Sequence, residues 1–121
     1  MKDERTEDVI LHIAEAAHWA SAQDEGVYLV STLGKTLAEV GFIHCSGVDQ
    51  VERVANAAYV GREDLVLLVI DPERVRAEIR YENGEGGVEL FPHVYGPLNV
   101  DAVVEVVSFP PGPDDRFTRP W

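Results

Sequence analysis

The sequence predicts an α+β fold in which all 121 residues form one domain. Two observations lead to this prediction: short apolar segments of strand length recur along the chain, and two longer segments place apolar residues at helical spacing. A chain of this length can bury one sizeable core, and no repeat or linker divides it. We expect about six strands and two main helices, with residues 1–8 and 110–121 as irregular tails.

The first predicted strand and helix follow each other directly. Val9–Ile13 is a short apolar run and is expected to form a strand. Ala14–Gln23 is rich in alanine, has helical spacing and is expected to form a helix. Gly26 suits the C-terminal cap of this helix, because glycine adopts a left-handed conformation without strain. Residues 27–40 hold a short apolar piece and then a loop or weak helix.

The middle of the chain contains the clearest elements. Phe42–Cys45 is expected to form a strand, and Val48–Tyr59 a helix with apolar residues at three- and four-residue intervals. Leu65–Ile70, with the sequence LVLLVI, is apolar on both faces. A strand of this kind is buried on both sides, so the sequence predicts that it is central in its sheet.

Two further strands and a proline-containing segment complete the predicted domain. Ala77–Glu82 alternates in polarity like a strand, and a glycine-rich connection follows it. Leu90–Leu98 is interrupted by two prolines, which favours an edge strand or an ordered loop, because proline cannot donate to a sheet ladder. Ala102–Phe109 is expected to form the last strand.

The charge balance bears on the partners of the protein. Ten Lys and Arg residues stand against 22 Asp and Glu residues, which gives a formal net charge of −12. A field of this sign repels phosphate backbones and anionic membrane surfaces. No segment concentrates basic residues: Glu52 precedes Arg53, and acidic residues follow Arg62. The composition therefore disfavours a polynucleotide or membrane partner and leaves a small anionic ligand as an alternative.

We accordingly predict no useful affinity for generic RNA or DNA at physiological salt. Binding to a polyanion needs several cationic contacts, whose counterion release makes affinity steeply dependent on salt. An anisotropy titration with labelled RNA and DNA should show no binding in the micromolar range. Micromolar, salt-sensitive binding would contradict this prediction, and Arg53 and Arg62 would then be the first residues to test.

The chain shows no sign of secretion or membrane insertion. No apolar run approaches the roughly 20 residues needed to span a bilayer, and the charged N-terminus does not resemble a signal peptide. Cys45 is the only cysteine, so no disulfide can form within the chain. A reducing cytoplasm is therefore the expected location.

Histidines at the ends of apolar strands are the strongest candidates for a functional site. His12, His44 and His93 each lie within or next to an apolar strand where the pattern breaks. Hydroxyl groups accompany two of them, since Ser46 follows His44 and Tyr95 follows His93. Because strand ends beside turns commonly carry chemistry, we expect these three histidines to converge on one cleft. A histidine in a strand is also often a hydrogen-bonded structural residue, and that alternative stays open.

Metal binding and thiol catalysis are disfavoured by spacing. Three histidines could bind zinc, but neither an HExxH motif nor a CxxC pair is present, so no metal is expected. Successive side chains of a strand point to opposite faces. If His44 faces a cleft, Cys45 therefore points into the core, where a thiol acts as a small hydrophobic group.

Three segments resemble a known family. In chain order they are ILHIAEAAHWASA, GFIHCSGVDQVERVANAAYVGREDLVLLVIDPERV and FPHVYGPLNVDAVVEV. They are similar to the bacterial family described as domain of unknown function 952. Its fold is related to ADP-ribosyltransferases, which bind NAD in a cleft. The resemblance implies an ADP-ribosyltransferase-like fold of two small split sheets, antiparallel or mixed, with two main helices.

A more distant resemblance to RNA 2′-phosphotransferases implies roles for particular residues. By that resemblance, His12 holds the ribose next to nicotinamide, and His44 and Ser46 lie on the facing strand as further catalytic residues. Transfer from NAD also requires an aromatic surface for nicotinamide and fixed polar contacts to the ribose. Four residues are expected to contact the nucleotide: Tyr59, Glu82, His93 and Tyr95.

Two functions follow from the sequence. The first is binding of NAD or a related small-molecule nucleotide, with transfer of ADP-ribose as the possible reaction. The second is a non-catalytic ligand-binding or interaction domain whose histidines are structural.

Overall fold

The computed structural model describes residues 9–83 and 87–120, and the predicted tail over residues 1–8 lies outside this part. The helices in the described part are α2 (Ala16–Glu25), α3 (Leu37–Val40) and α4 (Val51–Ala58), with 3₁₀ turns η1 (Pro72–Arg74) and η2 (Val100–Ala102). The strands are β1 (Ile10–Glu15), β2 (Val27–Tyr28), β3 (Ile43–His44), β4 (Leu65–Ile70), β5 (Glu78–Glu82), β6 (Phe91–Tyr95), β7 (Leu98–Asn99) and β8 (Val103–Ser108). The α+β class is confirmed, and no described helix is long and apolar enough to cross a membrane.

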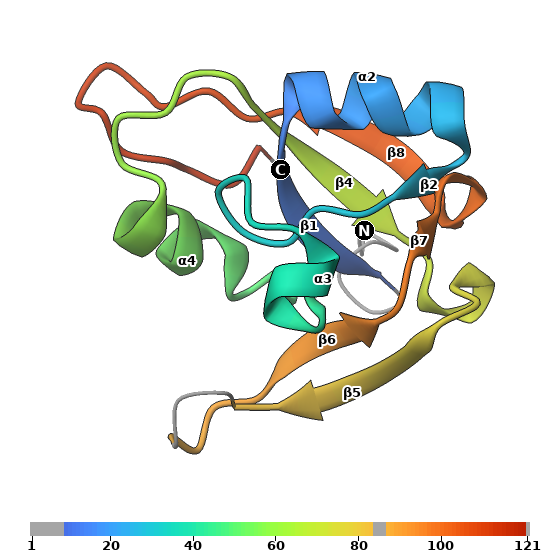
Figure 1. Ribbon diagram of the computed structural model, residues 1–121. Coiled ribbons are helices and arrows are strands. Elements are labelled where there is room, and N and C mark those ends of the chain that lie inside the picture. Colours follow the sequence, from blue (N-terminus) through green and yellow to red (C-terminus); the bar gives the residue numbers. More distant parts are fainter. Residues whose placement is uncertain (1–8, 84–86, 121) are drawn as a thin grey trace, which may run out of the picture.

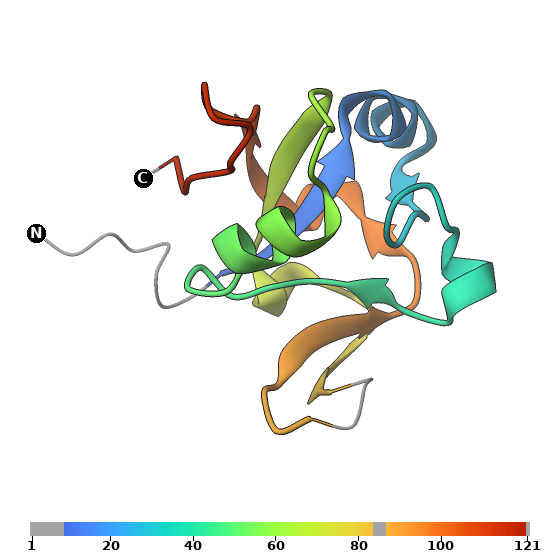
Figure 2. The ribbon, with the colours of Figure 1, turned by 90° about the vertical axis from the view of Figure 1, so that its left-hand side faces the viewer.

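The strands form small antiparallel sheets (Figure 1). One sheet has the order β1-β4-β8 and another the order β3-β6-β5, while β2 and β7 form a two-stranded pair. Figures 1 and 2 show the β3-β6-β5 sheet on the opposite side of the molecule from α2. A bridge between Leu11 and Ser46 connects β1 with the segment that follows β3, so the two three-stranded sheets are linked at this point.

The β1-β4-β8 sheet separates two halves of the hydrophobic core. The prediction that Leu65–Ile70 is a central strand is confirmed, because β4 lies between β1 and β8. On one face, Leu67 and Val69 pack with residues of α4 and with Phe117. On the other face, Leu68 and Ile70 pack with a second set of residues. The alternation of side chains along β1 and β4 therefore decides which half of the core each residue enters.

The segment with two prolines occupies a different position from the predicted one. It forms β6, which lies in the middle of its sheet, between β3 and β5. An edge strand or loop was expected because proline lacks an N–H, but the Pro92 carbonyl still accepts a hydrogen bond from the Cys45 N–H at 2.9 Å. The N–H that Pro92 lacks would face the segment after His44, where β3 has already ended. The β3–β6 ladder of His44 with His93 and Ile43 with Val94 is therefore kept.

Local capping explains the helix ends. Gly26 closes α2 in the left-handed conformation, with φ of 85°, as the sequence predicts. The segment expected to be a loop or weak helix contains the short helix α3. Thr36 and Glu39 form a reciprocal capping box at its start, which satisfies two backbone donors that a helix of this length otherwise leaves unpaired.

The segment after β8 contains neither helix nor strand over residues 109–120, yet it contributes to the core. Phe117 is 1% exposed, and its ring lies 5.1 Å from that of Phe109. The Asn56 side chain of α4 donates to the Phe117 carbonyl at 3.0 Å and accepts from the Phe117 N–H at 2.8 Å. The segment is therefore attached to α4 by a pair of hydrogen bonds and by a buried aromatic ring.

Candidate functional site

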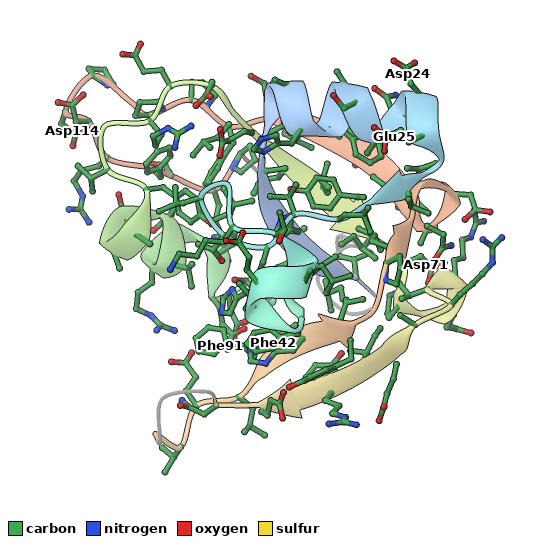
Figure 3. All side chains as sticks on the ribbon, viewed as in Figure 1. Asp24, Glu25, Phe42, Asp71, Phe91 and Asp114 are labelled. Atoms are coloured by element: carbon green, nitrogen blue, oxygen red, sulfur yellow. The ribbon has the colours of Figure 1, made fainter. Side chains whose placement is uncertain are left out.

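A cavity of about 490 Å³ lies between α4 and the β3-β6-β5 sheet. Its lining residues are Thr32, Phe42, His44, Arg53, Val54, Ala57, Ala58, Tyr59, Asn83, Phe91 and His93. Figure 3 shows Phe42 and Phe91 close together, next to β6 and on the side of it that faces α4. Cavities of this size are typical of small-molecule sites.

One wall of the cavity consists of rings from β3 and β6. His44 lies opposite His93 in the β3–β6 ladder, and their ring centroids are 5.3 Å apart. Phe42 stacks on His93 at 4.0 Å, with 13° between the ring planes, and Phe91 lies 5.2 Å from His44. Phe42 and His44 share one strand face, as do Phe91 and His93, so alternation along two short strands brings four rings together.

The predicted division of the GFIHCS segment is confirmed. His44 lines the cavity, whereas Cys45 is buried in the core. Burial lowers the pKa of His44 to about 4, and the nearby His93 contributes to the shift. Burial also raises the pKa of the Cys45 thiol. At neutral pH, His44 is therefore an uncharged hydrogen-bonding group, and Cys45 is a protonated thiol inside the core.

The prediction that three histidines share one cavity is wrong for His12. Its side chain points to the face of β1 opposite Leu11 and Ile13, which pack toward α4. His12 is 1% exposed and does not line the cavity. Nδ1 lies 2.7 Å from the His44 carbonyl oxygen, and Nε2 lies 3.0 Å from the Tyr28 hydroxyl. Because a carbonyl can only accept, Nδ1 carries the proton, and Tyr28 donates to Nε2.

Ser46 and Tyr59 lie in different environments. Ser46 is buried and does not line the cavity. Its backbone N–H and carbonyl pair with Leu11 at 2.7 Å in both directions, which holds the end of the GFIHCS segment against β1. Tyr59 lines the cavity from the end of α4, as expected for a ligand-contacting residue, although most of its ring is buried. The catalytic and nucleotide-binding roles of these residues stay predictions.

Glu82 connects two of the predicted site residues. Its Oε1 lies 3.1 Å from Nδ1 of His93 and also accepts a hydrogen bond from the Tyr95 hydroxyl. These hydrogen bonds lower the pKa of Glu82, the one from Tyr95 contributing most. The pKa of Tyr95 is raised for the same reason. Glu82 and Tyr95 do not line the cavity themselves, but each contacts a residue that does: Glu82 contacts His93, and the Tyr95 ring lies 5.4 Å from that of Phe42.

Several lining residues were not predicted as site residues. Arg53 contributes a guanidinium group from α4, and it pairs with Glu89 at 2.9 Å. Val54 and Ala58 belong to the apolar stripe of the predicted helix, but they line the cavity, whereas Val51 and Ala55 are buried in the core. Their position at the border of the apolar stripe is the only sequence signal that distinguishes them.

Metal ligation has no support in the described residues. Within residues 9–83 and 87–120, no group of three or more His, Cys, Asp or Glu side chains is arranged to hold a metal ion. In particular, both ring nitrogens of His12 are hydrogen-bonded, one with the His44 carbonyl and one with the Tyr28 hydroxyl. Nδ1 of His93 is hydrogen-bonded with Glu82.

The fold and the cavity together define a small α+β domain of antiparallel sheets with a ring-lined site. The chain belongs to the family described as "Protein of unknown function (DUF952)", whose model matches residues 13–106. The crystal structure of protein CC0527 from Caulobacter crescentus is similar, with 29% identity and a TM-score of 0.78 over 91% of this chain and 93% of that one. A solution NMR structure of CC0527 gives 30% identity and a TM-score of 0.75, covering 89% of this chain and 90% of that one. No curated protein matches the chain.

The low pKa values of His12 and His44 predict that the folded protein loses stability in acid. Burial lowers the pKa of His12 from its ordinary 6.5 to about 4. Between these values the unfolded chain binds a proton that the folded protein excludes, so stability is present above pH 6.5 and is lost as pH falls. We expect His12 alone to cost about 2 kcal/mol between pH 7 and pH 5, and His44 to add in the same direction. Urea unfolding at a series of pH values measures this loss.

The comparison with His44→Gln isolates the contribution of His44. This variant should lose less stability over the same interval, since glutamine does not titrate. Glu82 and Glu89 have lowered pKa values and stay ionised between pH 7 and pH 5, so they do not obscure the effect. Equal stability of the wild type at pH 7 and pH 5 would contradict the assignment of His12 as a neutral group.

Proposed function

We propose that this protein binds NAD or a related nucleotide in the cavity between α4 and the β3-β6-β5 sheet, and that the domain has an ADP-ribosyltransferase-like fold. Two three-stranded antiparallel sheets, connected where Leu11 meets Ser46, support the proposed fold. Transfer of ADP-ribose is the reaction that this proposal includes.

The ring-lined wall is the observation that carries the proposal. Phe42, Phe91 and the imidazoles of His44 and His93 offer flat faces and hydrogen-bonding nitrogens in one place. A planar heterocycle such as nicotinamide or adenine stacks on such faces, and each stacked base contributes roughly 1–3 kcal/mol. Imidazole nitrogens that carry no fixed charge suit the hydroxyls and the carboxamide of a neutral ribosyl group.

The remaining lining residues are compatible with a nucleotide. The cavity volume of about 490 Å³ is sufficient for a ring with its ribose. Arg53, on the opposite wall, is the cationic group that would meet a phosphate, in exchange for its pairing with Glu89. Phe91 would thus stack on the ring, His44 would hydrogen-bond with the sugar, and Arg53 would meet the phosphate.

We predict that NAD and ADP-ribose raise the melting temperature and that Phe91→Ala weakens this response. A ligand that binds only the native state stabilises it by about 2.7 kcal/mol at a hundredfold excess over Kd. Loss of the Phe91 ring should raise Kd at least about fivefold, since it removes a stacking surface. Thermal-shift titrations with NAD, ADP-ribose and nicotinamide, each referred to the melting temperature of the same variant, measure both effects.

Tyr81→Ala is the matched control for this experiment. Tyr81 is an exposed aromatic residue of β5, in the same sheet as Phe91 but outside the cavity lining. The Tyr81→Ala variant should bind as the wild type does. A flat response of the wild type to all three compounds at millimolar concentration would argue against the proposed function.

A second candidate, a non-catalytic domain with structural histidines, is favoured by the environment of His12. Both of its ring nitrogens are hydrogen-bonded within the protein, so it is not placed to hold a ribose. Under this alternative, the cavity binds a ligand without chemical change, or the protein serves as an interaction domain. Binding of NAD without any turnover would support the ligand-binding form of this alternative.

A further inference from the structure

His93 is oriented by contacts at its face and at its edge. Phe42 stacks on its ring at 4.0 Å with 13° between the planes, which fixes the plane of the imidazole. Glu82 lies 3.1 Å from Nδ1, which fixes the rotation of the ring within that plane. Glu82 is itself held by the Tyr95 hydroxyl. Orientation of this kind, by a ring on one side and a carboxylate at the edge, prepares an imidazole for proton transfer.

The contact with Glu82 also determines the tautomer of His93. The Glu82 carboxylate can only accept, because its lowered pKa keeps it ionised at neutral pH. In the uncharged form of the ring, Nδ1 therefore donates to Glu82, and Nε2 carries a lone pair. Since His93 lines the cavity, this lone pair is the basic site that the wall offers to a bound molecule.

We propose that His93 is a general base, that Glu82 is its positioning residue, and that the base activates a hydroxyl for attack on C1′ of a nicotinamide riboside unit. The inference rests on the proposed function, because it needs NAD or a related nucleotide in the cavity. The hydroxyl belongs to water or to an alcohol acceptor.

The reaction balances without a further reagent. The oxygen of the hydroxyl forms a bond to C1′, and the bond between C1′ and the pyridinium nitrogen breaks. Its electron pair stays on that nitrogen, so nicotinamide leaves as a neutral molecule. The proton of the hydroxyl passes to Nε2 of His93 and then to solvent. The Glu82 carboxylate stabilises the imidazolium that forms, in the way a carboxylate supports the histidine of a catalytic triad.

The other candidates for a base are excluded by their environments. His12 does not line the cavity. His44 lines it, but a pKa of about 4 makes it a weak base at neutral pH. The hydroxyl of Tyr95 has a raised pKa and donates to Glu82, so it stays protonated. His93 is the remaining imidazole with a supporting carboxylate.

The test measures nicotinamide release and NAD binding on the same preparations. NAD is incubated with the wild type and with His93→Ala, Glu82→Gln and Glu78→Gln, in water and with added methanol as an alcohol acceptor. We expect turnover by the wild type, a drop in kcat of roughly 100-fold in His93→Ala, and partial rescue of that variant by free imidazole. Glu82→Gln should lower kcat with little change in KM.

Glu78→Gln is the matched control, since Glu78 lies on β5 and pairs with Arg80 at the surface. It should keep the wild-type kcat. Glu82→Asp and His93→Gln replace the first variants should those fail to fold, with partial activity expected for the former and none for the latter.

The outcomes separate this inference from the proposed function. If NAD binds but the wild type releases no nicotinamide, or if His93→Ala and Glu82→Gln keep the wild-type kcat, the base assignment is overturned and NAD binding stands. If NAD does not stabilise the protein at all, both proposals are overturned. If Glu82→Gln lowers only the melting temperature, Glu82 is structural, and its assignment as a positioning residue is overturned.

Discussion

Replacement of Phe117 by alanine is expected to lower the free energy of unfolding by about 3–5 kcal/mol. The Phe117 ring is 1% exposed and packs against Phe109 and the α4 side of the β1-β4-β8 sheet. Its loss removes apolar contacts and leaves a cavity that the surrounding residues cannot fill, since α4 and the sheet are held by other interactions. Urea unfolding monitored by circular dichroism measures the change. Because small domains have a total stability of about 5–15 kcal/mol, the effect is large.

Val60→Ala serves as the control for Phe117→Ala. Val60 is exposed and lies just after α4, so its truncation should change stability by no more than about 0.5 kcal/mol. If Phe117→Ala changed stability as little as Val60→Ala does, the segment over residues 109–120 would not contribute to the core as described.

Replacement of His12 by alanine is expected to cost about 3–5 kcal/mol at pH 7. The substitution leaves a cavity between β1 and Tyr28 and removes the partners of two groups, the His44 carbonyl and the Tyr28 hydroxyl. A buried polar group without a partner costs about 1–3 kcal/mol. Because the His44 carbonyl belongs to β3, the substitution should also displace the ring-lined wall of the cavity. Ligand binding should therefore be weaker in the variant.

Tyr28→Phe separates the two hydrogen bonds of His12. It removes only the hydroxyl, leaves Nε2 of His12 unpaired and should cost about 1–3 kcal/mol. The combined variant His12→Ala with Tyr28→Phe should cost less than the sum of the two single changes, because the residues interact directly. Strict additivity would contradict the direct contact.

Much of the fold follows from short-range patterns in the sequence. Leu65–Ile70 was identifiable as a central strand because it is apolar on both faces, and Gly26 as a helix cap because of its conformational freedom. The opposite orientations of His44 and Cys45 followed from strand alternation alone. These features depend on neighbouring residues, which the sequence shows directly.

The incorrect predictions concern features that depend on long-range arrangement. Alternation places His12 opposite Leu11, but only the packing of α4 against one face of β1 decides which of the two faces the cavity. Pro92 argues against a central strand until it is known that β3 ends beside it. Phe117 lies in a segment of charged and proline residues, so no periodicity indicates that it is buried.

The attachment of Phe117 to α4 has a consequence for the order in which the protein forms during synthesis. Asn56 and Phe117 are 61 positions apart, and β4 must pair with both β1 and β8. Translation proceeds at about 5–20 residues per second, so the ribosome adds these 61 residues over several seconds after Asn56. During this time, α4 lacks the Phe117 ring that packs in the same core cluster. The core on the α4 side of the β1-β4-β8 sheet can therefore be completed only after Phe117 has been synthesised, well after α4 itself.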